Sequence, residues 1–183
     1  AAAQASGYGN YYGIAVRGRR VVFLVDCSGS MTAKMQTSTR MEVAKQNLIA
    51  VIRGFDDRVN FGIIAFETGL RPYAQELVAA HKQEIEKAEK WVRALNPAGA
   101  TNVYDSLERA LAMTEVEEVY LLTDGAPTAG QITDTESLLV RILAKNRFLR
   151  VRIHTIGFAP SAAGRVFLSK LAGQNGGEYA EPK

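Results

Sequence analysis

The stretch VVFLVDCSGSM, residues 21–31, places an acid and two serines directly after an uninterrupted apolar run. A continuous run of apolar and partly β-branched residues is typical of a strand that is buried on both faces, as in a parallel sheet. The charge of Asp26 and the hydroxyls of Ser28 and Ser30 contribute nothing to a hydrophobic core. The stretch therefore predicts a buried strand over residues 20–26 that carries polar groups at its carboxyl end.

Strands and helices alternate through the rest of the chain. Apolar runs predict further strands over residues 59–66, 118–123 and 150–158, a short hairpin partner over residues 70–73 at a sheet edge, and a last short strand over residues 178–180. Amphipathic periodicity predicts helices over residues 39–55, 81–95, 103–113, 134–148 and 162–172. This alternation indicates an α/β fold in which helices cover both faces of a mostly parallel sheet.

The length and organisation of the chain predict one domain behind an N-terminal segment. A chain of 183 residues suits a single domain with a sizeable core. Residues 1–18 begin with small, polar and aromatic residues without periodicity, so we expect a linker or extended arm there and the folded domain over residues 19–183. The sequence begins with Ala and has no signal-peptide layout. We expect a piece of a larger multidomain protein, and the compartment stays open, since an exported or cell-surface host protein is compatible with this sequence.

Composition argues against two kinds of partner. The net charge of +3 is small, and the basic residues form no stripe with interleaved aromatics, so we expect no nucleic-acid binding. No apolar run approaches the roughly 20 residues of a membrane span.

The single cysteine, Cys27, excludes an intrachain disulfide. Because side chains alternate along a strand, we expect its thiol to point away from Asp26 and Ser28 and to be buried.

Oxygen-bearing side chains follow the predicted strands in three loops. Asp26, Ser28 and Ser30 follow the first strand, Thr101 lies in the loop NPAGATN, and Asp124 follows the strand over residues 118–123. Each has a plain structural interpretation, such as a helix N-cap for Thr101 or its neighbour and a turn for Asp124. The carboxyl ends of parallel strands share one edge of the sheet, where ligands bind near the point of strand-order reversal. Two aspartates at that edge would repel each other without a positive charge between them.

A small divalent cation would remove this repulsion. Carboxylates and hydroxyls are hard oxygen donors that suit Mg²⁺, with Ca²⁺ or Mn²⁺ as alternatives. The D-x-S-x-S alternation lets one loop direct several side chains toward one point, and we expect Gly29 to permit the tight backbone. Because hydroxyls are neutral, the two aspartates at most balance the ion. If either aspartate acts through a bridging water, the directly bound ligands leave the ion short of negative charge, and we then expect the metal to take a further carboxylate from outside the domain.

These residues resemble a known site. D-x-S-x-S at Asp26, Ser28 and Ser30, the Thr of GATN at Thr101 and the Asp of TDG at Asp124 resemble the metal-ion-dependent adhesion site of a von Willebrand factor type A (vWA) domain. The similarity covers residues 20–180, and the phrases YYGIAV, TDGAPTAG and RVRIHTIGF resemble bacterial members. The resemblance implies a Rossmann-like, doubly wound three-layer sandwich. Its central sheet would have six strands, five of them parallel and one a short antiparallel edge strand.

The resemblance also implies how such a site works. Ser28, Ser30 and Thr101 would contact the metal directly, and Asp26 and Asp124 would do so directly or through water. In the family, the open coordination position takes a Glu or Asp from a protein partner. From their loop positions, we expect the surrounding rim to consist of Met31, Lys34, Met35, Phe66, Glu67, Tyr104, Pro127 and Thr128. The resulting prediction is a divalent-metal-dependent protein-binding module for adhesion or scaffolding, and not an enzyme.

A metal-dependent hydrolase or phosphatase that uses the same acidic and serine cluster is the alternative. Ser28 lacks the G-x-S-x-G context of a hydrolase nucleophile, and no motif links His81 or His154 to it. Asp26 could form an aspartyl-phosphate, but Ser28 stands where a second acid would be needed. The chain also has no G-x-x-x-x-G-K-[ST] phosphate loop. The sequence thus favours binding over catalysis.

Overall fold

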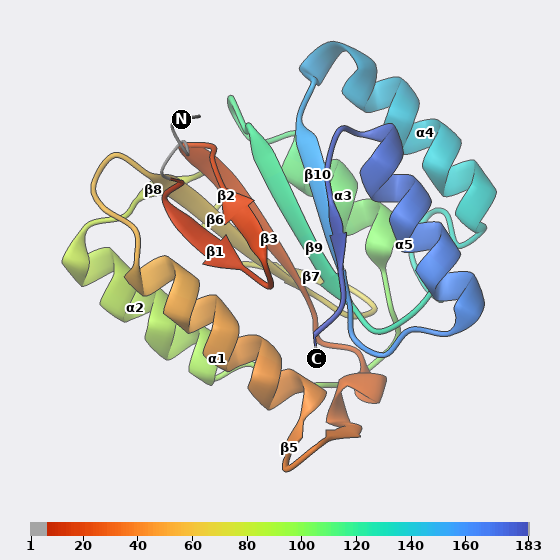
Figure 1. The fold of residues 1–183 in the computed structure, drawn as a ribbon, viewed down its shortest axis with the longest axis horizontal. Coiled ribbons are helices and arrows are strands. Elements are labelled where there is room, and N and C mark those ends of the chain that lie inside the picture. The colour runs from red at the N-terminus through yellow and green to blue at the C-terminus, as the bar shows by residue number, and fades with distance from the viewer. Residues whose placement is uncertain (1–6, 183) are drawn as a thin grey trace, which may run out of the picture.

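The first apolar run forms strand β3 (Arg20–Asp26) in the middle of a mixed sheet (Figure 1). This computed structural model describes residues 7–182. The strand order is β11-β10-β9-β3-β6-β7, and β8 also pairs with β6. The other strands are β6 (Asn60–Phe66), β7 (Leu70–Pro72), β8 (Val78–Ala79), β9 (Glu118–Thr123), β10 (Arg152–Gly157) and β11 (Tyr179–Ala180).

The predicted α/β class with a mostly parallel sheet is confirmed. Strands β11, β10, β9, β3 and β6 run parallel to one another, whereas β7 and β8 each pair antiparallel with β6. The antiparallel edge therefore consists of two short strands, and the sheet has seven strands where we expected six. Strand β8 has only two residues, too few to produce a periodic pattern in the sequence.

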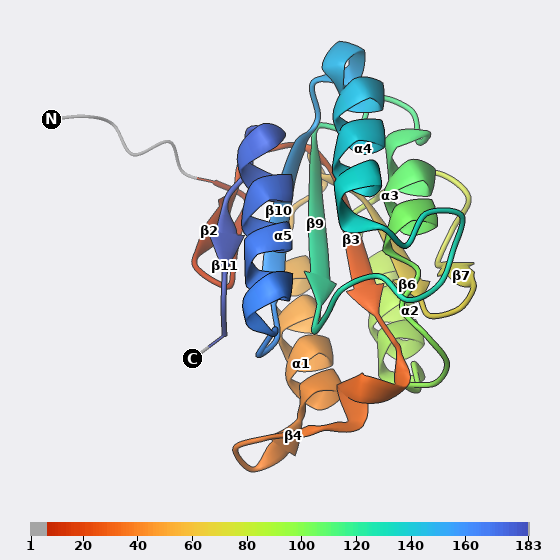
Figure 2. The ribbon, with the colours of Figure 1, turned by 90° about the vertical axis from the view of Figure 1, so that its right-hand side faces the viewer.

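Helices cover both faces of the sheet, and the period-two alternation of β3 supplies both cores. Val21, Phe23 and Val25 pack in one hydrophobic cluster with residues of α1 and α2, while Val22 and Leu24 pack in the other with residues of α3, α4 and α5. Figure 2 shows α4 and α5 in front of the strands. The helices are α1 (Arg40–Arg53), α2 (Lys82–Arg93), α3 (Val103–Leu111), α4 (Thr135–Leu149) and α5 (Ala162–Gln174).

Helix α1 starts where the sequence predicts. The Thr39 hydroxyl accepts a hydrogen bond from the Glu42 backbone N–H at 3.2 Å, and the Glu42 carboxylate accepts one from the Thr39 N–H at 2.7 Å. This reciprocal capping box satisfies two backbone donors at the helix start. A small hairpin of β4 (Lys34–Met35) and β5 (Ser38–Thr39) precedes the helix. Within residues 7–182, no helix combines the length and the apolar character that crossing a membrane requires.

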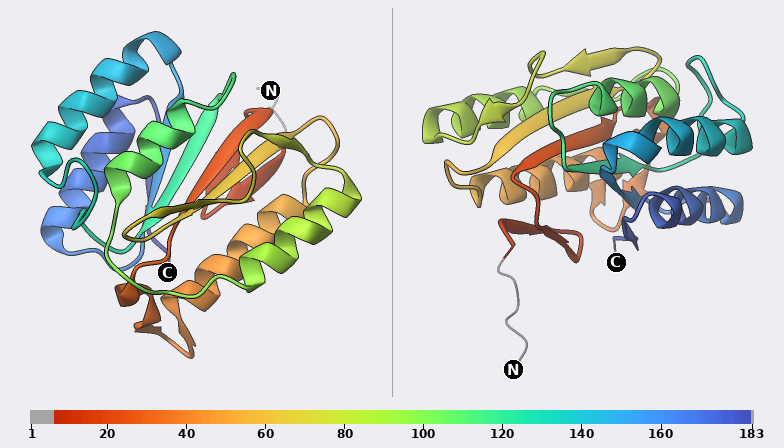
Figure 3. Two further views of the ribbon diagram at one scale, coloured as in Figure 1. Left: turned by 180° about the vertical axis from the view of Figure 1, so that it is seen from behind. Right: turned by 90° about the horizontal axis from the view of Figure 1, so that it is seen from above.

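An N-terminal β-hairpin differs from the linker or extended arm that we expected over residues 1–18. Strands β1 (Gly9–Tyr11) and β2 (Ile14–Val16) pair antiparallel on the α1 side of the sheet (Figure 3). The Tyr11 ring lies edge-on to Phe23 at a centroid distance of 5.2 Å and to Tyr120 at 5.9 Å. Three-residue strands are too short for a periodic signal, which explains the difference. Residues 1–6 lie outside the described residues.

Substitutions of Tyr11 test whether the hairpin belongs to the core. Tyr11 is 1% exposed, so Tyr11→Ala is expected to lower the free energy of unfolding by about 3–5 kcal/mol, as for other buried aromatics. The Tyr11 hydroxyl is buried and has no hydrogen-bond partner among the described residues. Tyr11→Phe is therefore expected to leave stability unchanged or to raise it.

Urea unfolding followed by circular dichroism measures both changes, with Arg17→Ala as the exposed control. A Tyr11→Ala protein as stable as the wild type would mean that the hairpin is not part of the cooperative fold.

Candidate metal centre

The topology brings two aspartates to one crevice. The chain runs from β3 to β6 on one side and later to β9 on the other side, so the strand order reverses beside β3. Asp26 is the last residue of β3, and Asp124 directly follows β9. Both carboxylates therefore lie at the carboxyl edge of the sheet at its switch point, which is where ligands bind in open α/β sheets.

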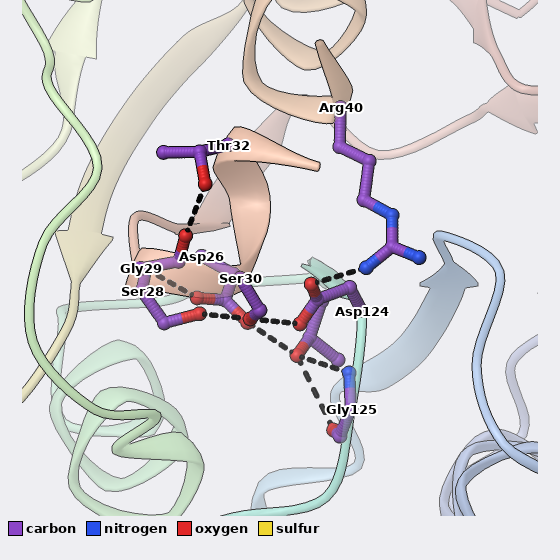
Figure 4. A network of polar contacts seen from close by, with 9 residues as sticks. Asp26, Ser28, Gly29, Ser30, Thr32, Arg40, Asp124 and Gly125 are labelled. Atoms are coloured by element: carbon purple, nitrogen blue, oxygen red, sulfur yellow. Dashed lines mark hydrogen bonds and ion pairs between the residues drawn. The ribbon is translucent and has the colours of Figure 1, made fainter. Parts of the chain in front are cut away.

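The Asp26 carboxylate is held in a fixed orientation. Its side chain has no exposed surface, and its Oδ1 accepts a hydrogen bond from the Ser28 backbone N–H at 2.7 Å. Its Oδ2 accepts one from the Thr123 hydroxyl at 2.5 Å. The residues after Ser28 form a 3-10 turn over Gly29–Thr32, which reverses the chain beside the carboxylate (Figure 4).

The two serines connect the first loop to Asp124. The hydroxyl oxygens of Ser28 and Ser30 lie 3.1 Å apart, and the Ser30 hydroxyl donates to Asp124 Oδ1 at 2.9 Å (Figure 4). With the Ser28 N–H bond to Asp26, this makes one continuous network. The structure thus brings together four of the five side chains that the sequence nominates as ligands.

Backbone hydrogen bonds join the Thr101 loop to the other two loops. The Ala98 N–H donates to the Cys27 carbonyl at 2.7 Å, and the Gly29 N–H donates to the Gly99 carbonyl at 3.1 Å. The Thr101 carbonyl accepts from the Thr128 N–H at 2.9 Å. These bonds fix the three loops as one unit at the sheet edge.

The Thr101 side chain is available for a ligand. The N-cap of α3 is Asn102, whose side chain accepts a hydrogen bond from the Asp105 N–H at 3.2 Å, so Thr101 is not the cap. Within residues 7–182, the Thr101 hydroxyl makes no hydrogen bond, although the residue is only 6% exposed. The hydroxyl oxygen is not among the fully buried polar atoms, so it is open at the site and free to act as a ligand for a bound ion.

A glycine in the Thr101 loop, not Gly29, permits the tight backbone. Gly29 does not have a positive φ, and a Cβ there would meet only the Gly99 carbonyl at an ordinary 3.6 Å. Gly99 has a φ of +70°, and a Cβ there would lie 2.7 Å from the Thr68 hydroxyl. The expectation about Gly29 is therefore wrong, because the first loop turns through a 3-10 turn with ordinary dihedral angles.

Burial controls the charge states beside the network. Burial, with a smaller contribution from the Asp124 carboxylate, raises the pKa of Asp26 to about 6. Burial also raises the pKa of the Cys27 thiol to about 12. Cys27 is fully buried in the core cluster on the α1 side, which confirms the prediction of a buried thiol.

Two polar partners at the site were not predicted from the sequence. Thr123 donates to Asp26, and the Arg40 guanidinium Nη1 lies 2.7 Å from Asp124 Oδ2. Arg40 is the first residue of α1 and lies 84 positions before Asp124 in the chain. A local sequence pattern cannot predict an ion pair between residues so far apart in the chain. The Thr123 contact follows from the register in which β3 and β9 pair, which places the ends of these strands side by side.

The donor set fits a small, hard divalent cation. The candidate ligands are two carboxylates and three hydroxyls, so every ligand atom is an oxygen. They lie on the three hydrogen-bonded loops at the switch point. Oxygen donors of this kind suit Mg²⁺, Ca²⁺ or Mn²⁺ and not softer metals. Among the described residues, no group of three or more His, Cys, Asp or Glu is arranged to hold a metal. The hydroxyls are therefore an essential part of this donor set.

The structure narrows the predicted rim. Lys34 and Thr128 are exposed, and Met35 and Glu67 are partly exposed. The other four residues of the predicted rim are buried: Met31, Phe66, Tyr104 and Pro127. Met31 packs into the core on the α1 side, and Phe66 ends β6 inside the core on the α3 side. Partner contact by the exposed residues stays a prediction.

The fold and this edge site define a doubly wound α/β domain with polar loops at its switch point. The sequence profile of the von Willebrand factor type A domain matches residues 19–180, so the chain belongs to that family. Whether it is of the bacterial type stays a prediction.

Known proteins from several organisms are similar to this chain. It is 29% identical over 179 residues to human inter-alpha-trypsin inhibitor heavy chain H4, a match that covers 90% of this chain and 18% of that protein. It is 32% identical over 170 residues to human von Willebrand factor A domain-containing protein 3A, covering 89% of this chain and 13% of that protein. The chain thus spans less than a fifth of the length of either relative.

Solved structures show the same fold. A von Willebrand factor type A protein from Catenulispora acidiphila superposes with a TM-score of 0.75 at 24% identity, covering 92% of this chain and 40% of that one. The PilB minor pilin from Streptococcus sanguinis superposes with a TM-score of 0.65 at 16% identity, covering 93% and 58%.

A matched pair of glycine substitutions tests the loop geometry. Gly99→Ala is expected to lower the free energy of unfolding by about 1–2 kcal/mol or more, because an L-residue is strained at positive φ and its Cβ would collide with Thr68. Gly29→Ala is expected to change stability by no more than about 0.5 kcal/mol. Thermal unfolding in chelator measures both without any contribution from metal. Equal losses in the two variants would contradict the assignment of the tight turn to Gly99.

Proposed function

We propose that the domain is a divalent-metal-dependent protein-binding module for adhesion or scaffolding. In this proposal a Mg²⁺ ion, or Ca²⁺ or Mn²⁺, is held by Asp26, Ser28, Ser30, Thr101 and Asp124. The observation that carries the proposal is the continuous oxygen network at the switch point, in the same loop unit as a Thr101 hydroxyl that makes no hydrogen bond inside residues 7–182.

The charge balance favours an acidic partner. The hydroxyl donors are neutral, and one of the two carboxylates, Asp124, already carries an ion pair with Arg40. A bound cation would supply an open coordination position for a carboxylate oxygen. The two hydrogen bonds to Asp26 hold its carboxylate in place, and the exposed Lys34 adds positive charge on the rim. We therefore propose a protein ligand that presents a Glu or Asp side chain.

Family membership supports an interaction role. The relatives of this vWA domain include an inter-alpha-trypsin inhibitor heavy chain and a von Willebrand factor A domain-containing protein. The small share of each relative that the chain covers supports a host with several domains.

The local chemistry around Ser28 gives little support to the enzyme alternative. His154 lies in β10, is 3% exposed, and accepts a hydrogen bond on Nδ1 from the Glu178 N–H at 3.1 Å. His81 lies at the start of α2. Within the described residues, neither histidine is hydrogen-bonded to Ser28, whose hydroxyl contacts Ser30. A serine nucleophile needs an adjacent base, so binding remains the proposed role.

The first test concerns the metal. Asp26→Asn is expected to remove Mg²⁺ binding and to stay folded, because the amide replaces a buried carboxylate of similar shape. For the wild type, Mg²⁺ at about 100 times its Kd should add about 2.7 kcal/mol to the free energy of unfolding. Titration calorimetry and thermal unfolding with Mg²⁺ and with chelator measure the effect, and Asp57→Asn, remote in sequence and exposed, is the control. An equal Mg²⁺ response in wild type and Asp26→Asn would contradict the ligand assignment.

A second test separates binding from catalysis. Because neither histidine is hydrogen-bonded to Ser28 within the described residues, a fluorophosphonate probe is expected to leave it unlabelled, while a serine hydrolase treated in parallel is labelled. Intact-mass and peptide mass spectrometry detect the adduct. Stoichiometric labelling at Ser28 would favour the enzyme.

A further inference from the structure

Arg40 forms the one ion pair that involves a proposed ligand among the described residues. Its Nη1 lies 2.7 Å from Asp124 Oδ2, and Figure 4 shows the side chain extending from the start of α1 toward that carboxylate. The Asp124 side chain is 4% exposed and that of Arg40 is 19% exposed. An ion pair so shielded from water is screened less by salt than a surface pair. The guanidinium is therefore a strong local counter-charge.

The position of Arg40 is fixed by the loop that carries the ligands. The Arg40 N–H donates to the Ala33 carbonyl at 2.9 Å, and Ala33 directly follows the 3-10 turn that contains Ser30. The capping box at Thr39 fixes the start of the helix one residue earlier. The backbone is thus anchored, while the long side chain above it has rotatable bonds. Arg40 can keep its place in the fold and still change its partner.

The two oxygens of Asp124 have different partners. Oδ1 accepts from the Ser30 hydroxyl at 2.9 Å, and Oδ2 accepts from Arg40. A divalent cation among the serine hydroxyls would place two positive charges beside the guanidinium that already neutralises this carboxylate. Like charges at short range in a poorly hydrated site repel strongly. The single negative charge of Asp124 cannot fully neutralise both the metal ion and the Arg40 guanidinium.

We propose that Arg40 is an internal substitute for the metal: it neutralises Asp124 when the site is metal-free and competes with the divalent cation for that carboxylate. This inference rests on the proposed metal site. It assigns Arg40 two opposing effects, since the guanidinium stabilises the metal-free fold and weakens metal binding. The metal affinity is then set by the difference between two cations that compete for one carboxylate.

Two substitutions separate charge competition from simple positioning. Arg40→Gln removes the charge but keeps an N–H donor for Asp124, and Arg40→Met removes both. If Arg40 competes with the metal, both variants bind Mg²⁺ at least about fivefold more tightly than wild type, a typical size for coupling between sites. If Arg40 only positions Asp124, Arg40→Gln keeps the wild-type affinity and Arg40→Met binds more weakly. Arg53→Met, at the far end of α1 in an ion pair with Glu89, is the matched control.

The full chain is titrated with Mg²⁺ alone by calorimetry, and thermal unfolding is recorded in chelator. We expect tighter Mg²⁺ binding by both Arg40 variants, a lower unfolding midpoint for both in chelator, and wild-type affinity for Arg53→Met. Arg40→Gln is the variant that decides if Arg40→Met fails to fold, because it retains the donor. Unchanged or weaker Mg²⁺ binding by Arg40→Gln overturns this proposal and leaves the metal site standing. If no protein, wild type included, binds Mg²⁺, the proposed metal site fails and this inference fails with it.

Discussion

Two carboxylates at the carboxyl ends of neighbouring parallel strands are the constraint around which this domain is built. Asp26 ends β3 and has no exposed surface, and Asp124 follows β9 and is nearly as buried. Water can do little to stabilise the charge of either carboxylate, so each needs a hydrogen-bond donor or a cation within the protein. The hydroxyls, backbone N–H groups and guanidinium around them meet that need, which is why polar residues are concentrated at a point where a core would place apolar ones.

Hydroxyl groups suit such a place because they can act in two ways. A serine hydroxyl donates its proton to a carboxylate, as Ser30 does to Asp124, and still has lone pairs for a cation. The same side chains can therefore satisfy the aspartates without a metal and could also surround the metal ion that we propose. Backbone hydrogen bonds join the loops of Cys27, Gly99 and Thr128, so we expect any change on metal binding to be confined to the side chains.

Much of the fold and part of the site could be predicted from short-range patterns. The apolar run before Asp26 identified the central strand, and the alternation of strands and helices identified the parallel sheet. Four predicted ligands meet in one network because strand ends at one sheet edge must be neighbours. Arg40 could not be predicted, since its contact with Asp124 depends on the packing direction of α1 and not on spacing in the chain. The strands of the hairpin that holds Tyr11 are too short to show a hydrophobic period. The positive φ of Gly99 depends on its contact with the loop that contains Thr68, which is distant in sequence.

Both edges of the sheet end in very short strands. At one edge β11 has two residues, and at the other β7 and β8 share the side of β6. Pro72 of β7 lies opposite Ile64 and has no N–H to offer, and the exposed Arg71 stands next to it. Neither edge presents a long, flat row of free backbone groups, which is how natural sheets resist edge-to-edge aggregation. A domain protected in this way is poorly suited to recruiting a partner by strand addition. It can therefore be displayed at high local density, as on a surface or in a fibre, without its sheets joining those of its neighbours.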